Sequence, residues 1–394
     1  MNRRFLLYCI LIIQCLYSQS TVLKKINDYN IENKDFVDTI PIEFIHNRIF
    51  FPVTINGNVY RFVLDTGSAN CTLFNENIGL TLRCDTIGRN EIQDANNIKK
   101  IVPIINVPDL MVGKIDFKNI RAATLNTQLE RAQCFDFDGL IGTNILKDKI
   151  LKIDIRKKII ILTDHKNYFN NESGVILSLE VHNNCIPYFD ILPVSKCKDR
   201  VFLDTGNPAF YVMNNQYYNK IKMKNIQVPI ADKCSGNLYA GMWGTGKDTT
   251  SIKLQLDDVV LGNLTIHNVK TVVYSYVVSS IGSDILNSGS LTLDYIHKKL
   301  IFIPYQNSDT IVSQYDFPPF CLIPENGKVK VRMIWKKSEA YRQGLRIGFT
   351  INSVNGLSIQ DVCDFMRQWN NLKGNITMEC LDLKNNPVSF HLVK

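Results

Sequence analysis

The sequence feature that most constrains the fold is a tripeptide, Asp-Thr-Gly, which occurs twice, each time at the end of an apolar run. The two copies are Asp65-Thr66-Gly67 and Asp204-Thr205-Gly206. Average composition would place one such tripeptide by chance in roughly a tenth of chains of this length. Two copies in matched contexts therefore indicate an internal repeat.

The repeat extends well beyond the tripeptides. An apolar-Gly pattern ends at Gly142, 77 residues after Asp65, and recurs at Gly282, 78 residues after Asp204. Each copy then runs through basic residues into another apolar stretch. A period of about 140 residues is too long for a solenoid unit and has the size of a domain. We therefore expect two similar lobes side by side, at residues 38–165 and 175–306.

The secondary structure of both lobes is expected to be mainly β. Short apolar or alternating runs bounded by Gly, Asn and Asp are typical of strands, and Asn56-Gly57 is a hairpin signal. The segments 144–147 and 284–288 suggest short helices. The predicted strands are residues 48–55, 59–64, 101–105, 118–125, 201–203, 252–256 and 269–278.

The start of the chain has the pattern of a signal peptide. Arg3 and Arg4 precede a largely apolar stretch at 5–17, and Ser18 and Ser20 place small residues before a cut at Thr21. Thirteen residues are few for a membrane span, and an uncleaved anchor is the alternative. We expect residues 1–20 to be removed and the protein to be exported to the periplasm, the cell surface or the medium, with no integral membrane span.

Charge and cysteine content limit the classes of partner and cofactor. The formal charge of +8 comes from dispersed lysines, which indicates a solvated surface rather than a nucleic-acid partner. Nine cysteines follow the leader without a Cys-x-x-Cys pair, so we expect no metal and no other cofactor. Local disulfides, Cys71 with Cys84 or Cys185 with Cys197, and buried thiols remain equally open.

The two aspartates suggest a chemistry. Gly67 and Gly206 permit tight turns from which the preceding carboxylates project. If the turns meet across a pseudo-twofold axis, Asp65 and Asp204 share one proton, because two adjacent carboxylates do not both ionise cheaply. One carboxylate can then take a proton from water while the other donates to an amide carbonyl. Such a pair titrates as a unit and favours mildly acidic activity.

Residues 40–306 resemble the aspartic peptidases of the retropepsin and pepsin type, through the two Asp-Thr-Gly motifs and the later apolar-Gly patterns. The resemblance implies two acid-protease β-barrels, catalytic roles for Asp65 and Asp204, and an active monomer because both halves lie in one chain. It implies that Thr66 and Thr205 bond across to the opposite loop and that Ser68 bonds the outer carboxylate oxygen. The implied residues that support the dyad are Thr66, Gly67, Ser68, Thr205, Gly206 and Asn207.

The second half departs from the family pattern at two positions. Asn207 replaces the usual Ser, Thr or Ala, and its amide can still donate, so we expect an asymmetric dyad. Ser280 stands where an apolar residue is usual. A mobile flap is expected over the cleft. The Gly-rich segment 236–246, with Tyr239, Met242 and Trp243, is the candidate, and the alternative is that this segment is an ordinary hairpin. Residues 88–97 form the matching segment of the first lobe.

The last part of the chain, after a linker at 308–319, has a different pattern. Ser338-Glu339-Ala340, Gly344-Leu345, Gly348 and Asn355-Gly356 resemble the PDZ domains of bacterial exported proteases, which implies an α+β domain at 316–394. PDZ domains bind chain termini by strand addition, and the carboxylate loop would align with Phe320, Cys321 and Leu322. The alternative is that this segment only packs against the protease lobes.

Together these patterns predict an exported aspartic endopeptidase that acts on peptides or unfolded proteins, with a PDZ domain that binds the termini of substrates or partners. The alternative is a binding protein on a protease scaffold, which grips peptides without cutting them. Turnover of a peptide separates the two.

Overall fold

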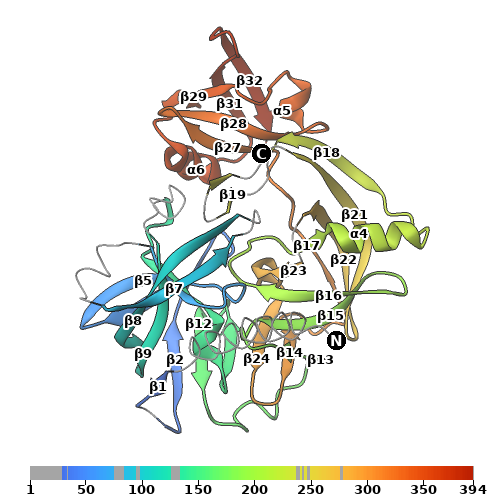
Figure 1. Ribbon diagram of the computed structural model, residues 1–394. Coiled ribbons are helices and arrows are strands. Elements are labelled where there is room, and N and C mark those ends of the chain that lie inside the picture. Colours follow the sequence, from blue (N-terminus) through green and yellow to red (C-terminus); the bar gives the residue numbers. More distant parts are fainter. Residues whose placement is uncertain are drawn as a thin grey trace, which may run out of the picture.

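The computed structural model describes residues 29–32, 34–74, 84–94, 98–125, 134–236, 240–241, 244–245, 249–275 and 278–393. The predicted leader and the flap residues Tyr239, Met242 and Trp243 lie outside these ranges. Within them, no helix has the length and hydropathy that a membrane crossing requires. The fold is mainly β with barrel-like halves, as the sequence predicts, and Figure 1 shows the two halves side by side with the C-terminal segment above them.

The first half is built on a curled nine-stranded sheet. Its central hairpin, β4 and β5, closes through Asn56 and Gly57, whose φ values of 48° and 80° are those that a tight hairpin turn requires. The strands of this half are β1 (Asn30–Ile31), β2 (Val37–Pro41), β3 (Glu43–Ile45), β4 (Arg48–Ile55), β5 (Asn58–Leu64), β6 (Cys71–Leu73), β7 (Thr86–Gln93), β8 (Lys99–Val112), β9 (Ile115–Thr124), β10 (Gly139–Ile141), β11 (Ile150–Asp154) and β12 (Ile159–Thr163).

The second half repeats this plan with its own hairpin of β15 and β16. A helix that periodicity did not reveal, α4 (Asn215–Met223), follows β17 and begins where the Asn214 side chain accepts from Tyr217 N at 2.6 Å. The strands are β13 (Val175–Ser178), β14 (Glu180–Val181), β15 (Pro187–Val194), β16 (Cys197–Asp204), β17 (Tyr211–Asn214), β18 (Ile230–Gly236), β19 (Ala240–Gly241), β20 (Gly244–Thr245), β21 (Thr249–Leu261), β22 (Leu264–Tyr274), β23 (Ser279–Gly282), β24 (Gly289–Asp294) and β25 (Lys299–Pro304).

The apolar-Gly motifs occupy equivalent places in the two halves. Strand β10 runs parallel to β5 and antiparallel to β6, and β23 has the same relation to β16 and β17. Each motif strand leads into a short 3-10 helix, η1 (Thr143–Leu146) or η2 (Ser283–Asn287). These match the two short helices expected from sequence.

A six-stranded antiparallel sheet joins the halves on the side away from the C-terminal segment (Figure 1). Its order is β13-β25-β24-β11-β12-β2, so that three strands come from each half. The central pair is β11 with β24, in which Leu151 lies opposite Leu293. Buried side chains of both halves form one continuous core around this sheet, which fixes the halves relative to each other.

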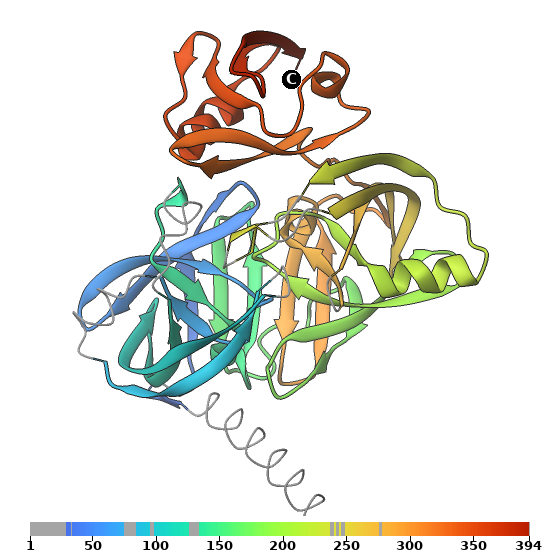
Figure 2. The ribbon, with the colours of Figure 1, turned by 45° about the horizontal axis from the view of Figure 1, so that its top comes forward.

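The C-terminal segment is joined to the second half by backbone pairing. Strand β28 pairs with β18, so the sheet of the second half continues into this segment, and Figure 2 shows the segment lying across both halves. Its elements are β27 (Phe320–Glu325), β28 (Lys328–Trp335), α5 (Glu339–Arg342), β29 (Thr350–Val354), β30 (Leu357–Ser358), α6 (Val362–Asn371), β31 (Asn375–Leu381) and β32 (Pro387–Val393).

The expected linker at 308–319 is not a free tether. It contains β26 (Thr310–Val312), which pairs with β22, and Phe317, which is buried with Trp335. Proline and aspartate predict an irregular backbone but do not show whether neighbouring apolar side chains are buried, so the packing of this segment was not predicted.

The cysteine pairing also differs from the local pairs considered from sequence. Cys134 of the first half and Cys363 of α6 form a disulfide with a Cα–Cα distance of 4.9 Å. Cys71, Cys84, Cys185 and Cys197 remain thiols. The bonded pair is 229 residues apart, and only the docking of the C-terminal segment on the first half brings it together.

Candidate active site

The two Asp-Thr-Gly loops meet at the centre of the molecule. Asp65 follows the end of β5, and its backbone N–H donates to Ile141 O of β10 at 3.0 Å. Asp204 ends β16, opposite Gly282 of β23. Each carboxyl is therefore placed by a strand and by the apolar-Gly strand beside it, as the repeat predicted.

The threonines lock the two loops together. Thr66 Oγ1 donates to Leu203 O at 2.8 Å and accepts from Thr205 N at 3.1 Å. Thr205 Oγ1 donates to Leu64 O at 2.8 Å and accepts from Thr66 N at 3.0 Å. Both threonines are fully buried, so these four hydrogen bonds have no competition from water.

The glycines let each carboxyl lie against the opposite loop. A Cβ on Gly206 would come within 2.7 Å of Asp65 Cγ, and a Cβ on Gly67 within 2.6 Å of Asp204 Oδ1. The apolar-Gly strands run behind the loops in the same close manner. A Cβ on Gly142 would lie 2.4 Å from Asn70 O, and one on Gly282 would lie 2.2 Å from Ala209 O.

Backbone N–H groups bind one oxygen of each carboxyl. Gly67 N donates to Asp65 Oδ1 at 2.9 Å. Asp204 Oδ1 accepts from Gly206 N at 3.1 Å and from Asn207 N at 3.2 Å. These bonds favour the ionised forms, while burial opposes them.

Burial is the larger influence, and it raises the pKa of both aspartates. The pKa of Asp204 is raised well above its usual range, first by burial and then by the neighbouring Asp65 charge. The rise in the pKa of Asp65, also from burial, is opposed by the Gly67 and Ser68 backbone N–H groups and by Arg48. No motif in the sequence pointed to a role for Arg48. Because the two buried carboxyls are coupled, they titrate as one pair.

Two supporting residues behave differently from the family pattern. The Ser68 hydroxyl donates to Asn70 O at 2.9 Å. Because a hydroxyl has only one proton to donate, Ser68 acts on the Asp65 carboxyl through its backbone N–H and not through its hydroxyl. Asn207 Nδ2 donates to Ser280 Oγ at 3.3 Å. The two unusual residues of the second half are thus partners of each other.

The residues aligned with a PDZ carboxylate loop lie at the start of β27, outside the dyad. Phe320 is buried, with its ring centroid 5.2 Å from that of Trp369 and 6.0 Å from that of Phe365 on α6. Cys321 and Leu322 are half-buried. Whether this strand start binds a carboxylate stays a prediction.

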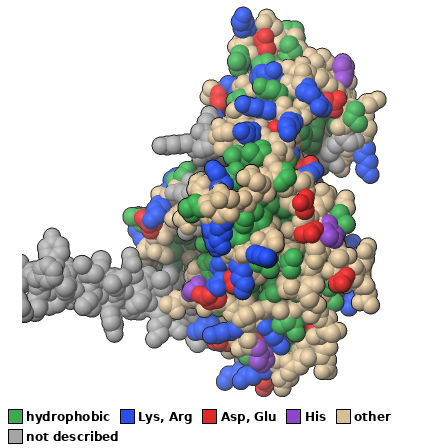
Figure 3. All heavy atoms as spheres, turned by 90° about the vertical axis from the view of Figure 1, so that its right-hand side faces the viewer, with side chains coloured by type: hydrophobic (Ala, Val, Ile, Leu, Met, Phe, Trp, Pro, Cys, Tyr) green, Lys and Arg blue, Asp and Glu red, His purple; other side chains and the backbone are tan. Residues whose placement is uncertain are grey.

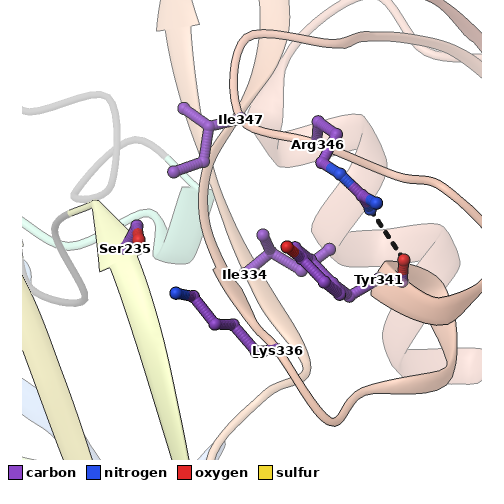
Figure 4. Close-up of a pocket in the computed structure, with 6 residues that line it drawn as sticks. All are labelled: Ser235, Ile334, Lys336, Tyr341, Arg346 and Ile347. Atoms are coloured by element: carbon purple, nitrogen blue, oxygen red, sulfur yellow. Dashed lines mark hydrogen bonds between the residues drawn. The ribbon is translucent and has the colours of Figure 1, made fainter.

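A pocket of about 290 Å³ lies where the second half meets the C-terminal segment (Figure 4). Arg346 donates to Tyr341 O at 2.7 Å within it. On the surface face shown in Figure 3, basic side chains are interspersed with acidic and hydrophobic ones. The pocket is lined by Ser235, Ile334, Lys336, Tyr341, Arg346 and Ile347.

Comparison with known proteins finds a family model that matches part of the first half. Residues 51–148, which include the first Asp-Thr-Gly loop and its apolar-Gly strand, match the model of a family described as gag-polyprotein putative aspartyl protease. No curated protein sequence matches the chain. Among solved structures, a retropepsin-like aspartic protease from Rickettsia conorii matches at 21% identity and a TM-score of 0.25, over 34% of this chain and 94% of that one. The first half is therefore similar to an aspartyl protease family.

Proposed function

We propose that the protein is an aspartic endopeptidase whose dyad is Asp65 and Asp204. The observation that carries the proposal is reciprocal: each carboxyl lies against the glycine of the opposite loop, and each loop is held by the threonine of the other. A scaffold that only bound peptides would have no need to press two carboxyls together, because their proximity costs ionisation energy.

The mechanism rests on one proton that the two buried carboxyls share, and we assign the role of base to Asp65 and that of acid to Asp204. Asp65, ionised, takes a proton from a water molecule held between the carboxyls, and the hydroxide equivalent attacks the peptide carbonyl. Asp204, protonated, donates its proton to the carbonyl oxygen as the tetrahedral species forms. The proton on Asp65 then passes to the leaving nitrogen as the C–N bond breaks, and Asp204 recovers a proton from the collapsing diol. Both halves are supplied by one chain, so a monomer suffices.

We propose that the protein works after export. The leader pattern at 1–20 supports this, and so does the Cys134–Cys363 disulfide, because disulfides persist in oxidising compartments. The periplasm, the cell surface and the extracellular medium all meet that requirement.

We propose that the C-terminal segment is a PDZ domain that binds chain termini. In support, β27 pairs with β28 on one side, while α6 packs beside it through Phe320 and Trp369. Such an arrangement of strand and helix suits addition of a peptide strand. Binding of one apolar peptide to the intact chain, with a free and with an amidated C-terminus, tests it: equal affinities would refute carboxylate recognition.

The proposed activity is tested by cleavage of an unfolded protein from about pH 3 to about pH 8, the range in which such a dyad titrates. Asp65→Asn and Asp204→Asn should each lower the rate about a thousandfold or more. Asp258→Asn, at an exposed position on β21, is the matched control and should retain activity. Tight binding by the wild type without turnover would support the scaffold alternative instead.

A further inference from the structure

The C-terminal segment is fastened to the second half next to the Asp204 loop. Cys234 to Gly236 of β18 pair with Met333 to Trp335 of β28, and Lys336 N donates to Lys233 O at 3.0 Å. Met333 and Trp335 are buried in one cluster with Ala209 and Val212, which directly follow the Asp204 loop in sequence. This attachment is an extended sheet with its own core, so it holds the segment firmly.

The same segment is fastened to the first half next to the Asp65 strand. Cys363 of α6 is bonded to Cys134, in a turn whose Phe135 and Asp136 carbonyls accept from the Arg61 guanidinium of β5. Strand β5 leads directly to Asp65. This attachment differs in kind from the first, because among the described residues it is the covalent one.

These two attachments complete a closed ring around the dyad. The halves are joined on one side by the β11–β24 pair of the six-stranded sheet, and the C-terminal segment bridges them on the other side (Figures 1 and 2). Three links close the ring: the interhalf sheet, the β18–β28 pairing and the disulfide. The disulfide is the link that chemistry can open without unfolding a sheet.

We propose that the Cys134–Cys363 disulfide is a latch that determines which substrates reach the dyad. A chain with a free end passes through a closed ring, whereas a loop anchored at both ends in a folded protein must enter as two strands at once. The latched protein is thus selective for peptides and unstructured segments. Opening the latch admits loops of folded proteins. The expected effect on cleavage rests on the proposed peptidase activity. The expected effect on binding of the two substrates does not depend on that activity.

The opening step is a thiol–disulfide exchange with a dithiol reductant. The Cys134–Cys363 S–S bond breaks, both sulfurs gain a proton, and the reductant closes to a disulfide, so two electrons and two protons pass to the latch. Both cysteines are only half-buried, which gives the reductant access. Cys84 and Cys321 are half-buried thiols and the other five free cysteines are buried, so the latch is the accessible disulfide among the described cysteines.

The test uses one cysteine-free recognition sequence in two substrates, a linear peptide and a surface loop of a compact folded protein. The intact oxidised chain is compared with the Cys134→Ser/Cys363→Ser double variant. Opening the latch should raise kcat/KM for the loop substrate about tenfold or more while leaving the peptide within about twofold. Cys84→Ser, at a half-buried thiol outside the disulfide, is the matched control and should change neither value.

A second arm keeps the test valid if the double variant does not fold. Wild-type protein treated with dithiothreitol should show the same selective gain, and alkylation under denaturing conditions should increase by two thiols, those of Cys134 and Cys363. Equal effects on both substrates, or no effect on either, would overturn the latch.

A binding measurement distinguishes failure of the latch proposal from failure of the peptidase proposal. The Asp65→Asn variant is titrated with both substrates, latched and unlatched. If the wild type cuts neither substrate but unlatching selectively strengthens binding of the loop substrate, the peptidase proposal fails and the latch stands. If cleavage occurs and both ratios stay unchanged, the latch fails and the peptidase proposal stands. If the wild type neither cuts nor binds, both proposals fall.

Discussion

The Cα of Gly206 lies against the carboxyl group of Asp65, so that a Cβ there would come within 2.8 Å of both carboxyl oxygens. Gly67 and Asp204 have the reciprocal relationship. Both glycines are therefore required by the space that the opposite aspartate occupies. Each loop forms part of the floor on which the other carboxyl rests, and neither half has a complete site alone.

Gly206→Ala should abolish most activity while the chain still folds. The added methyl displaces the Asp65 carboxyl, and a misplacement on this scale costs about a hundredfold or more in kcat. Overpacking should also lower stability by about 1–3 kcal/mol. Peptide cleavage and thermal unfolding measure the two effects. A Gly206→Ala variant as active as the wild type would contradict the close contact between Gly206 and the Asp65 carboxyl.

Thr66→Val and Thr205→Val should each destabilise the protein by about 2–4 kcal/mol, because each leaves a buried carbonyl and a buried N–H unpaired. Thr66→Val leaves Leu203 O and Thr205 N without their partner. Thr205→Val leaves Leu64 O and Thr66 N without theirs. Thr→Ser at either position keeps both bonds and should cost much less.

Denaturant unfolding of the single and double variants measures this coupling. Because the two threonines share one network, the double variant should lose less than the sum of the singles. Strictly additive losses would mean that the two loops are held independently.

Much of this arrangement could be predicted from the sequence, since a repeated motif carries its own geometry. Two Asp-Thr-Gly copies with matched glycines 77 and 78 residues later were enough to place Asp65 beside Asp204 and β10 beside β5. The predicted strand 48–55 coincides with β4, in which buried and more exposed side chains alternate over part of the length. Helix α4 was missed because its nine residues bury only Tyr217 and Ile221, which is too little for a clear helical period.

What the sequence could not give was the docking of the C-terminal segment. The β18–β28 pairing, the burial of Phe317 and the Cys134–Cys363 bond depend on which surfaces meet after each part has folded. No local pattern records that choice, and backbone pairing between strand edges is almost independent of side-chain identity. The hydroxyl of Ser68 is a similar case, because its bond to Asn70 O depends on the local path of the loop rather than on residue type.

Asn207 and Ser280 should behave as a coupled pair. Their hydrogen bond of 3.3 Å joins the second catalytic loop to β23, the apolar-Gly strand behind it. We expect Asn207→Ala and Ser280→Ala to cost about 1 kcal/mol each, with the double variant no worse than the poorer single. Asn207→Ala should also shift the alkaline limb of the pH–rate profile, since this residue adjoins Asp204, the proposed acid. If the losses of unfolding free energy are additive and the pH–rate profile does not shift, the pair has no role at the dyad.

Asp199 should make stability fall as pH rises. It is buried on β16, accepts from Tyr211 Oη at 2.6 Å, and burial raises its pKa to about 6. The folded state therefore holds this proton more tightly than the unfolded state. Its contribution is fully present below the unfolded pKa of about 4 and is lost as pH rises through about 6, an effect on the order of 2–3 kcal/mol.

Asp199→Asn removes this titration while keeping an acceptor for Tyr211. The difference in unfolding free energy between variant and parent should therefore move in favour of the variant from about pH 4 to about pH 7. Urea unfolding in an Asp65→Asn background measures it without self-digestion, and subtraction cancels the other titrating groups. Asp257→Asn, at an exposed site on β21, should show a flat difference. A flat difference for Asp199→Asn as well would mean that this carboxyl titrates normally in the folded protein.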